Sequence, residues 1–171
     1  MTQILLAAFG LMFLLDATDK ALNPQRFVAS LSAYELLPTA LCGAAAVILG
    51  FAGFAVGAAL LGRFAVGPAS IVGAGLLLLF ASGMAINLWR GRADLECGCG
   101  TAAGGQRLQW RLVWRNTLLA AILLVAASTR DAVSLGVFQV LPAAFGLVLV
   151  YVAVTAVWAS GSRQQWHLWS R

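Results

Sequence analysis

Charged residues are scarce in this chain of 171 residues, of which Asp, Glu, Lys and Arg make up 10%. Soluble domains carry charge at about a quarter of their positions, so an ordinary soluble domain is excluded. Hydrophobic residues make up 61% of the chain, and its mean hydropathy is +0.90. We therefore predict an integral membrane protein.

Histidine and cysteine are also few. The single histidine, His167, excludes a His-based metal or catalytic cluster, and the three cysteines are too few for a disulfide scaffold. Eleven basic residues exceed six acidic ones, which gives a net charge of +5. The basic residues occupy short loops rather than one patch, which argues against a nucleic-acid partner. Their distribution is better explained by membrane topology.

Five apolar runs approach the length of about 20 residues that a helix needs to cross about 30 Å of hydrocarbon. They are residues 3–22, 37–61, 64–89, 112–128 and 132–160. The first run ends in charged residues and resembles a signal peptide in length. It lacks a basic start and an immediate cleavage site, so we predict a retained helix.

These runs predict an all-α fold, a polytopic membrane helical bundle. It has about five transmembrane helices, or four if the first does not span, and forms a single integral membrane domain over residues 1–171. Its two notable polar segments are a loop at 90–111 and a Trp-rich tail at 161–171. Within the spans, Gly53 and Gly57 form a small-xxx-small pair that permits close helix packing.

A short interfacial helix is predicted between the first two spans. Asn23 would cap it and Pro24 would occupy its first turn. Phe27, Leu31 and Tyr34 then fall on one face, which is typical of a helix lying in the membrane interface until Pro38.

Five crossings place the segments 16–36, 90–111 and the tail from Gly161 on one side, here named the basic side. Nine of the eleven Lys and Arg residues lie there: Lys20, Arg26, Arg90, Arg92, Arg107, Arg111, Arg115, Arg163 and Arg171. The positive-inside rule makes the basic side cytoplasmic. All six tryptophans lie at or beyond the same interface, where amphipathic rings prefer to be.

The loop 90–111 carries the most distinctive chemistry, the sequence Cys97-Gly98-Cys99-Gly100. The glycines permit positive φ, so the two thiols can face each other or approach a partner closely. A Cys-x-Cys disulfide closes a very small ring and departs from relaxed geometry, which makes it easier to reduce and suits exchange. Nearby arginines favour the thiolate, whereas Asp94 and Glu96 oppose it.

Cys42 lies about five residues into the second predicted span, near the same side of the membrane. It can resolve or shuttle a disulfide with Cys97 or Cys99, or it can be a small buried hydrophobe. The three thiols could alternatively bind a soft metal ion such as copper(I), mercury or zinc. A non-catalytic assembly scaffold is a third alternative, and only exchange would make the chain an enzyme or an accessory to one.

Other polar residues that gather near the basic side would be costly if they faced lipid. They are Asp16, Asp19, Glu35, Asn87 and Asn116. Arg107, Arg111 and Arg115 recur every four residues and share one helix face, which suits either an anionic-lipid anchor or a dock for acidic groups or a partner.

The order of these features resembles the methylamine utilisation protein MauE family over about residues 1–128. The resemblance rests on Asn23-Pro24-Gln25-Arg26-Phe27, on Tyr34-Glu35-Leu36-Leu37-Pro38, on the Cys97-Gly98-Cys99 loop and on Trp110-Arg111-Leu112-Val113-Trp114-Arg115-Asn116. Gly100-Thr101 follows the motif where an aromatic residue is expected, and the fifth span is less family-like.

The resemblance implies a DoxX-like, redox-associated protein of the bacterial inner membrane. It further implies maturation of an exported client, the disulfide-rich small subunit of methylamine dehydrogenase, alongside a thioredoxin-like partner. The substrate does not transfer with the fold. No cofactor is identified, and a quinone site cannot be found from the sequence.

The predicted side of the loop conflicts with this role, because disulfides of exported proteins form outside the cytoplasm. One interpretation is that a cytoplasmic thioredoxin supplies electrons that the protein passes outward. The other is that lipid and partner contacts hold the arginines on the outer face. The charge count favours the first.

Overall fold

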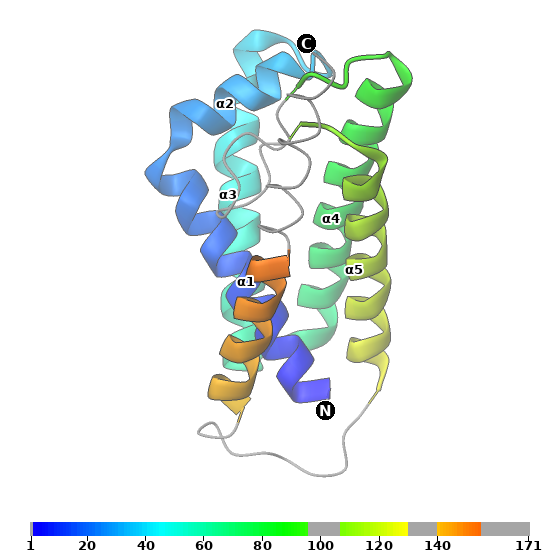
Figure 1. Ribbon diagram of the computed structural model, residues 1–171. Helices are drawn as coiled ribbons and strands as arrows, with labels where there is room; N and C mark the ends of the chain where they lie inside the picture. Colours follow the sequence, from blue (N-terminus) through cyan, green and yellow to red (C-terminus); the bar gives the residue numbers. More distant parts are fainter. Residues whose placement is uncertain (1, 96–106, 130–139, 155–171) are drawn as a thin grey trace.

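The computed structural model describes residues 2–95, 107–129 and 140–154, and these residues form helices joined by turns and short connections. The helices are α1 (Thr2–Leu22), α2 (Pro24–Ala33), α3 (Thr39–Gly62), α4 (Val66–Trp89) and α5 (Trp110–Ser128), followed by the unlabelled helix Val140–Val154 (Figure 1). No strand occurs in these three ranges. The predicted all-α membrane bundle is confirmed.

Three of the described helices, α3, α4 and α5, are long and apolar enough to cross a membrane. The chain is therefore a multi-pass membrane protein. The 21-residue α1 covers the first predicted span, and Val140–Val154 covers the described part of the last one. That these two helices also cross the membrane stays a prediction, and the tail 161–171 lies outside the described residues.

The helix boundaries differ from the predicted spans where the backbone turns sharply. Helix α3 begins at Thr39 rather than Leu37, because Pro38 is its N-cap and a residue before proline is disfavoured in helical geometry. Helix α4 begins at Val66 rather than Phe64, since Arg63 and Ala65 both adopt positive φ in the connection from α3.

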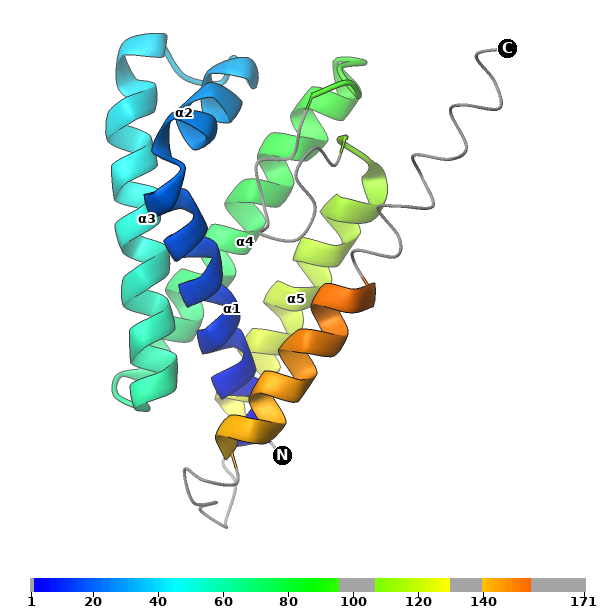
Figure 2. The same cartoon turned by 60° about the vertical axis from the view of Figure 1, so that its left-hand side comes forward.

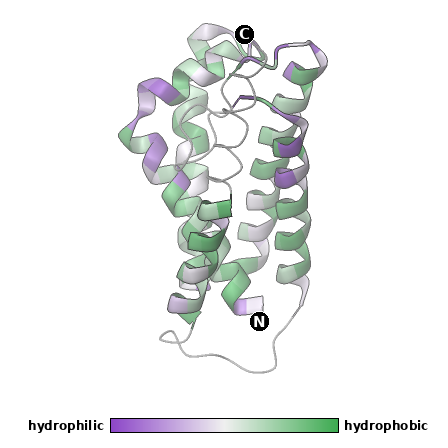
Figure 3. Cartoon of the chain, viewed as in Figure 1, coloured by the Kyte–Doolittle hydropathy of each residue, from purple (hydrophilic) through white to green (hydrophobic). Residues whose placement is uncertain are grey.

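The long helices α1, α3, α4 and α5 run in alternate directions along the bundle (Figure 1). The interfacial helix α2, the end of α4 and the start of α5 lie together at one end, whereas the N-terminus and the connection between α3 and α4 lie at the other. Hydrophilic residues gather at the α2 end and hydrophobic ones along the helices (Figure 3). The described parts of the segments 16–36 and 90–111, both assigned to the basic side, therefore share one end.

The bundle consists of two closely packed helix pairs, α1 with α3 and α4 with α5 (Figure 2). A central core joins them through Phe9 and Phe13 of α1, Leu60 of α3 and Leu123 of α5. Helix Val140–Val154 packs on the outside of α1, where Ala144 meets Ala7 and Ala8. Large apolar side chains such as Phe51 and Ile71 remain exposed, as expected for a lipid-facing surface.

Helices α1 and α3 pack closely at Gly10 and Gly57. A Cβ atom at Gly57 would lie 2.9 Å from the backbone oxygen of Gly10 and 2.8 Å from Leu14. A Cβ atom at Gly10 would in turn lie 3.1 Å from the Gly57 oxygen. Of the two glycines in the small-xxx-small pattern, Gly57 lies at this tight contact with Gly10, whereas a Cβ atom at Gly53 would lie 3.8 Å from Ala17.

Helix α2 begins as the sequence predicts, with Asn23 as its N-cap and Pro24 in its first turn, but it ends at Ala33 rather than continuing to Pro38, because Glu35 adopts a positive φ of 49°. The Asn23 side chain makes no capping bond to α2, and instead donates to the carboxylate and backbone oxygens of Asp19, both at 3.3 Å. Of the three residues predicted to share one face of this helix, Phe27 and Tyr34 are buried and Leu31 is half-buried.

Candidate functional site at the basic side

The end of α4 directs the chain into the predicted cysteine loop. Gly91 has φ +76°, and the amides of Gly91 and Arg92 donate to the carbonyls of Leu88 and Asn87 at 3.0 Å each. This pair of bonds is a Schellman motif, in which glycine adopts the left-handed conformation at little steric cost. The turn brings the Arg92 guanidinium within 2.8 Å of the Glu35 carboxylate.

The residues on either side of the Cys-Gly-Cys segment are joined by a backbone hydrogen bond. The Leu108 amide donates to the Leu95 carbonyl at 2.9 Å, and Arg107 lies 3.5 Å from Asp94 in an exposed ion pair. Leu108 is 1% exposed and belongs to a cluster with Tyr34, Met84 and Leu112. The two described flanks of the segment are therefore held together at one point. Cys97 and Cys99 themselves lie outside the described residues.

Cys42 occupies the first turn of α3 at the same end of the bundle. Its thiol is free and fully buried, and its Sγ atom donates to the Pro38 carbonyl at 3.6 Å. Among the described residues, no group of three His, Cys, Asp or Glu side chains could hold a metal ion. The soft-metal alternative needs Cys97 and Cys99, which lie beyond those ranges.

Two asparagines are buried at this end of α4 and α5. Asn87 is 0% exposed, and its amide nitrogen donates to the Gly83 carbonyl at 3.1 Å. Its Oδ1 atom has no hydrogen-bond partner in the described part of the chain. Asn116 is also buried, and its Oδ1 accepts from Arg115 Nε at 3.4 Å and Nη2 at 3.3 Å. Polar side chains thus turn inward rather than toward lipid.

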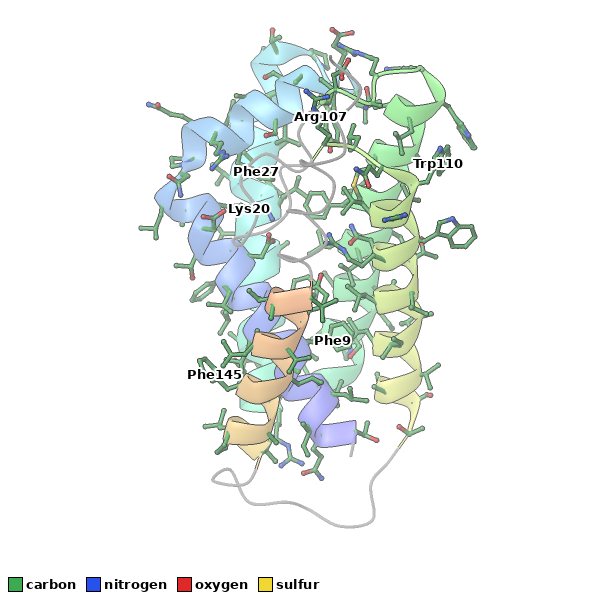
Figure 4. The ribbon with its side chains drawn as sticks, viewed as in Figure 1. Phe9, Lys20, Phe27, Arg107, Trp110 and Phe145 are labelled. Carbon is green, nitrogen blue, oxygen red and sulfur yellow. The ribbon has the colours of Figure 1, made fainter. Side chains whose placement is uncertain are left out.

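The prediction that three arginines share one helix face is wrong for Arg107, because α5 begins at Trp110 and Arg107 precedes it. Arg115 is half-buried against Asn116, whereas Arg107 and Arg111 are exposed. Trp89, Trp110 and Trp114 are exposed close by, and the rings of Trp89 and Trp110 lie 6.0 Å apart between centroids. Figure 4 shows Trp110 on the outer side of α5. Exposed arginine and tryptophan at one level are typical of a membrane interface.

A buried lysine is the site feature that sequence reasoning missed. The Lys20 side chain is 6% exposed and forms an ion pair with Asp16, one turn earlier in α1. Its Nζ atom lies 5.0 Å from the ring centroids of Phe27 in α2 and Phe80 in α4. Figure 4 shows Lys20 and Phe27 near each other. The four-residue spacing of Asp16 and Lys20 could have signalled the ion pair, but no sequence signal points to Phe80.

The predicted polar residues thus form separate contacts with different partners. Asp16 pairs with Lys20, Glu35 with Arg92, and Asn116 with Arg115. Asp19 is half-buried and contacts Asn23. With the anchored flanks of the Cys-Gly-Cys segment, these contacts define a multi-pass helical membrane protein whose polar chemistry collects at one end of the bundle.

The particular family follows from comparison with known proteins. Residues 1–129 match the family model described as methylamine utilisation protein MauE, and the chain belongs to this family. A curated relative with that name from Paracoccus denitrificans is 33% identical over 119 residues, which cover 70% of this chain and 64% of the relative. Another from Paracoccus versutus is 34% identical over 121 residues, which cover 71% and 65%.

The chain spans slightly less than two thirds of the length of these two relatives. A third relative, from Methylorubrum extorquens, is 47% identical over 45 residues, which cover 26% of this chain and 24% of the relative. No solved structure matches the chain. The family resemblance predicted from the sequence is confirmed.

Proposed function

We propose that this chain is an accessory membrane protein of methylamine utilisation that works by thiol-disulfide exchange at Cys97 and Cys99. It would support maturation of an exported client of the methylamine dehydrogenase type, together with a thioredoxin-fold partner. The family match and the names of its relatives support the pathway. The observation that carries the thiol chemistry is the Cys-Gly-Cys segment between Leu95 and Leu108, which are hydrogen bonded at the basic side.

Exchange at this segment takes two steps. The thiolate of one cysteine attacks a disulfide of the partner, which forms a mixed disulfide and releases the partner's other sulfur as a thiolate. The second cysteine thiolate then attacks the mixed disulfide and forms the Cys97–Cys99 bond. The partner leaves with two thiols, so two electrons have passed to it. In reverse, the Cys97–Cys99 disulfide oxidises a client dithiol.

Single cysteine variants should trap the partner, because the second step then has no attacking thiol. We expect Cys97→Ser or Cys99→Ser to accumulate a mixed disulfide with a thioredoxin-fold protein at least tenfold above the parent chain. Non-reducing gel electrophoresis before and after dithiothreitol measures the adduct, and mass spectrometry identifies the partner.

The double variant Cys97→Ser with Cys99→Ser is the control and should form no adduct. Absence of adducts from both single variants would contradict the proposal. Stoichiometric copper or zinc, lost from the same variants, would instead identify a soft-metal carrier.

The variant Cys42→Ser tests whether the buried thiol takes part in exchange, and the non-reducing gel again measures the adduct. A changed adduct level assigns Cys42 to the disulfide relay, and an unchanged level makes it a packing residue.

The charge distribution supports an orientation in the bacterial inner membrane with the basic side in the cytoplasm. We therefore expect a membrane-impermeant maleimide to leave Cys97 and Cys99 unmodified in intact spheroplasts and to modify them in inverted vesicles. Mass spectrometry of the loop peptide measures the modified fraction, after mild reduction so that both thiols are available. Full modification in intact spheroplasts would place the loop outside and reverse the assignment.

A further inference from the structure

Two arginine side chains at the basic side have no hydrogen-bond or ion-pair partner among the residues that the structure describes. They are Arg90, the C-cap of α4, and Arg111, in the first turn of α5, and both are exposed. The other three arginines between residues 90 and 115 each contact an acidic or amide side chain; they are Arg92, Arg107 and Arg115. Two positive charges therefore remain uncompensated at the neighbouring ends of α4 and α5.

Exposed tryptophans connect these two helix ends. Trp89 precedes Arg90 and Trp110 precedes Arg111, and the two indole rings lie 6.0 Å apart between their centroids. Trp114 lies one turn further along α5, and Figure 4 shows Trp110 on the outer side of this helix. These five residues, three tryptophans and two arginines, form one exposed surface that we name the tryptophan–arginine patch.

An apolar stripe leads away from the patch along the outside of α5. Trp114, Leu118 and Val125 lie on one face of the helix, and they are 71%, 61% and 63% exposed. From Trp114 to Val125 the stripe extends about 16 Å at 1.5 Å per residue, about half of a 30 Å hydrocarbon layer. The stripe therefore has the length that an acyl chain occupies in one leaflet.

The chemistry of the patch matches an anionic headgroup. A guanidinium group donates paired hydrogen bonds to phosphate oxygens, and indole rings prefer the depth at which glycerol and ester groups lie. A zwitterionic lipid brings its own cation, which offsets its phosphate charge and weakens its attraction to the arginines. Asp94, the acidic residue nearest to Arg90 in sequence, is paired with Arg107 and does not neutralise the patch.

We propose that the tryptophan–arginine patch binds an anionic phospholipid of the phosphatidylglycerol type. Its phosphodiester lies at Arg90 and Arg111, its glycerol region lies at the tryptophans, and one acyl chain follows Leu118 and Val125. The bound lipid holds the ends of α4 and α5 at the level of the headgroups. This site goes beyond the proposed function and does not depend on thiol chemistry, so either proposal can fail without the other.

Native mass spectrometry of the full chain in dodecylmaltoside micelles measures lipid binding. We expect phosphatidylglycerol to bind about tenfold more tightly than phosphatidylcholine, because two arginines attract its net negative charge. Arg90→Gln combined with Arg111→Gln should remove this preference. Arg26→Gln combined with Arg63→Gln is the matched control, because it removes the same charge from two exposed arginines outside the patch. The control should keep the preference.

Phosphatidylglycerol with a diazirine on one acyl chain tests the position of the site. We expect the label on peptides of α5, and we expect the double patch variant to lose it. If that variant does not fold by circular dichroism, Arg111→Gln alone should still lower the preference. Equal binding of the two lipids, an equal loss in the control, or labelling confined to other helices would overturn the proposal. Displacement of the lipid by an equal concentration of an acidic peptide would also overturn it, and would make the patch a protein-docking surface.

Discussion

Replacement of Lys20 by methionine is expected to lower the free energy of unfolding by about 3 kcal/mol, because it leaves the Asp16 carboxylate without its partner inside the bundle. The variant also removes the ammonium group from between the rings of Phe27 and Phe80, which connects α1 with α2 and α4. Unfolding in dodecylmaltoside micelles by titration with dodecyl sulfate, followed by circular dichroism, measures the change.

A second substitution separates the lost charge pair from lost packing. Asp16→Asn combined with Lys20→Met removes both charges and should recover at least half of the lost stability. Arg90→Met, at an exposed position in the same end of the bundle, is the control and should change stability by less than about 0.5 kcal/mol. If Lys20→Met were as stable as the parent chain, the ion pair would have no structural role.

Gly57→Ala is expected to lower the free energy of unfolding by about 2 kcal/mol, as overpacking of a tight interface does. The added methyl would lie 2.9 Å from the backbone oxygen of Gly10, which cannot rotate away as a side chain can. Helix α1 must therefore move away from α3 and lose contacts along the interface. The same dodecyl sulfate titration measures this loss.

Gly75→Ala provides the matched comparison, because it adds the same methyl to a transmembrane helix at a position with open space. Its stability should equal or slightly exceed that of the parent chain, since alanine favours helix over glycine. Equal stability of Gly57→Ala and Gly75→Ala would show that α1 and α3 are not held at the distance observed.

Much of the fold could be predicted from runs of apolar residues and from proline. The runs located α3, α4 and α5 to within two residues, and Asn23-Pro24 located the start of α2. These signals are local, because transfer of a helix into lipid depends on its own length and composition. The breaks at Pro38 and at Gly91 follow equally from backbone geometry.

The candidate site could be predicted only in part. The sequence identified Cys97 and Cys99 as reactive candidates and indicated that Asn87 and Asn116 avoid lipid. It gave no sign that Glu35 pairs with Arg92, 57 positions away. Pairing between distant residues depends on which helix faces meet, and hydropathy does not specify this.

The sequence by itself determined the membrane class, the positions of the helices and the gathering of hydrophilic residues at one end of the described bundle, because each depends on residue type and on order along the chain. Only the tertiary structure decided that Gly10 opposes Gly57, that Phe80 covers Lys20, and that Leu95 and Leu108 join at the base of the cysteine loop. Those contacts arise from the rotation and spacing of packed helices. In lipid, shape complementarity and buried polar contacts set that packing, since apolar surface alone supplies little preference.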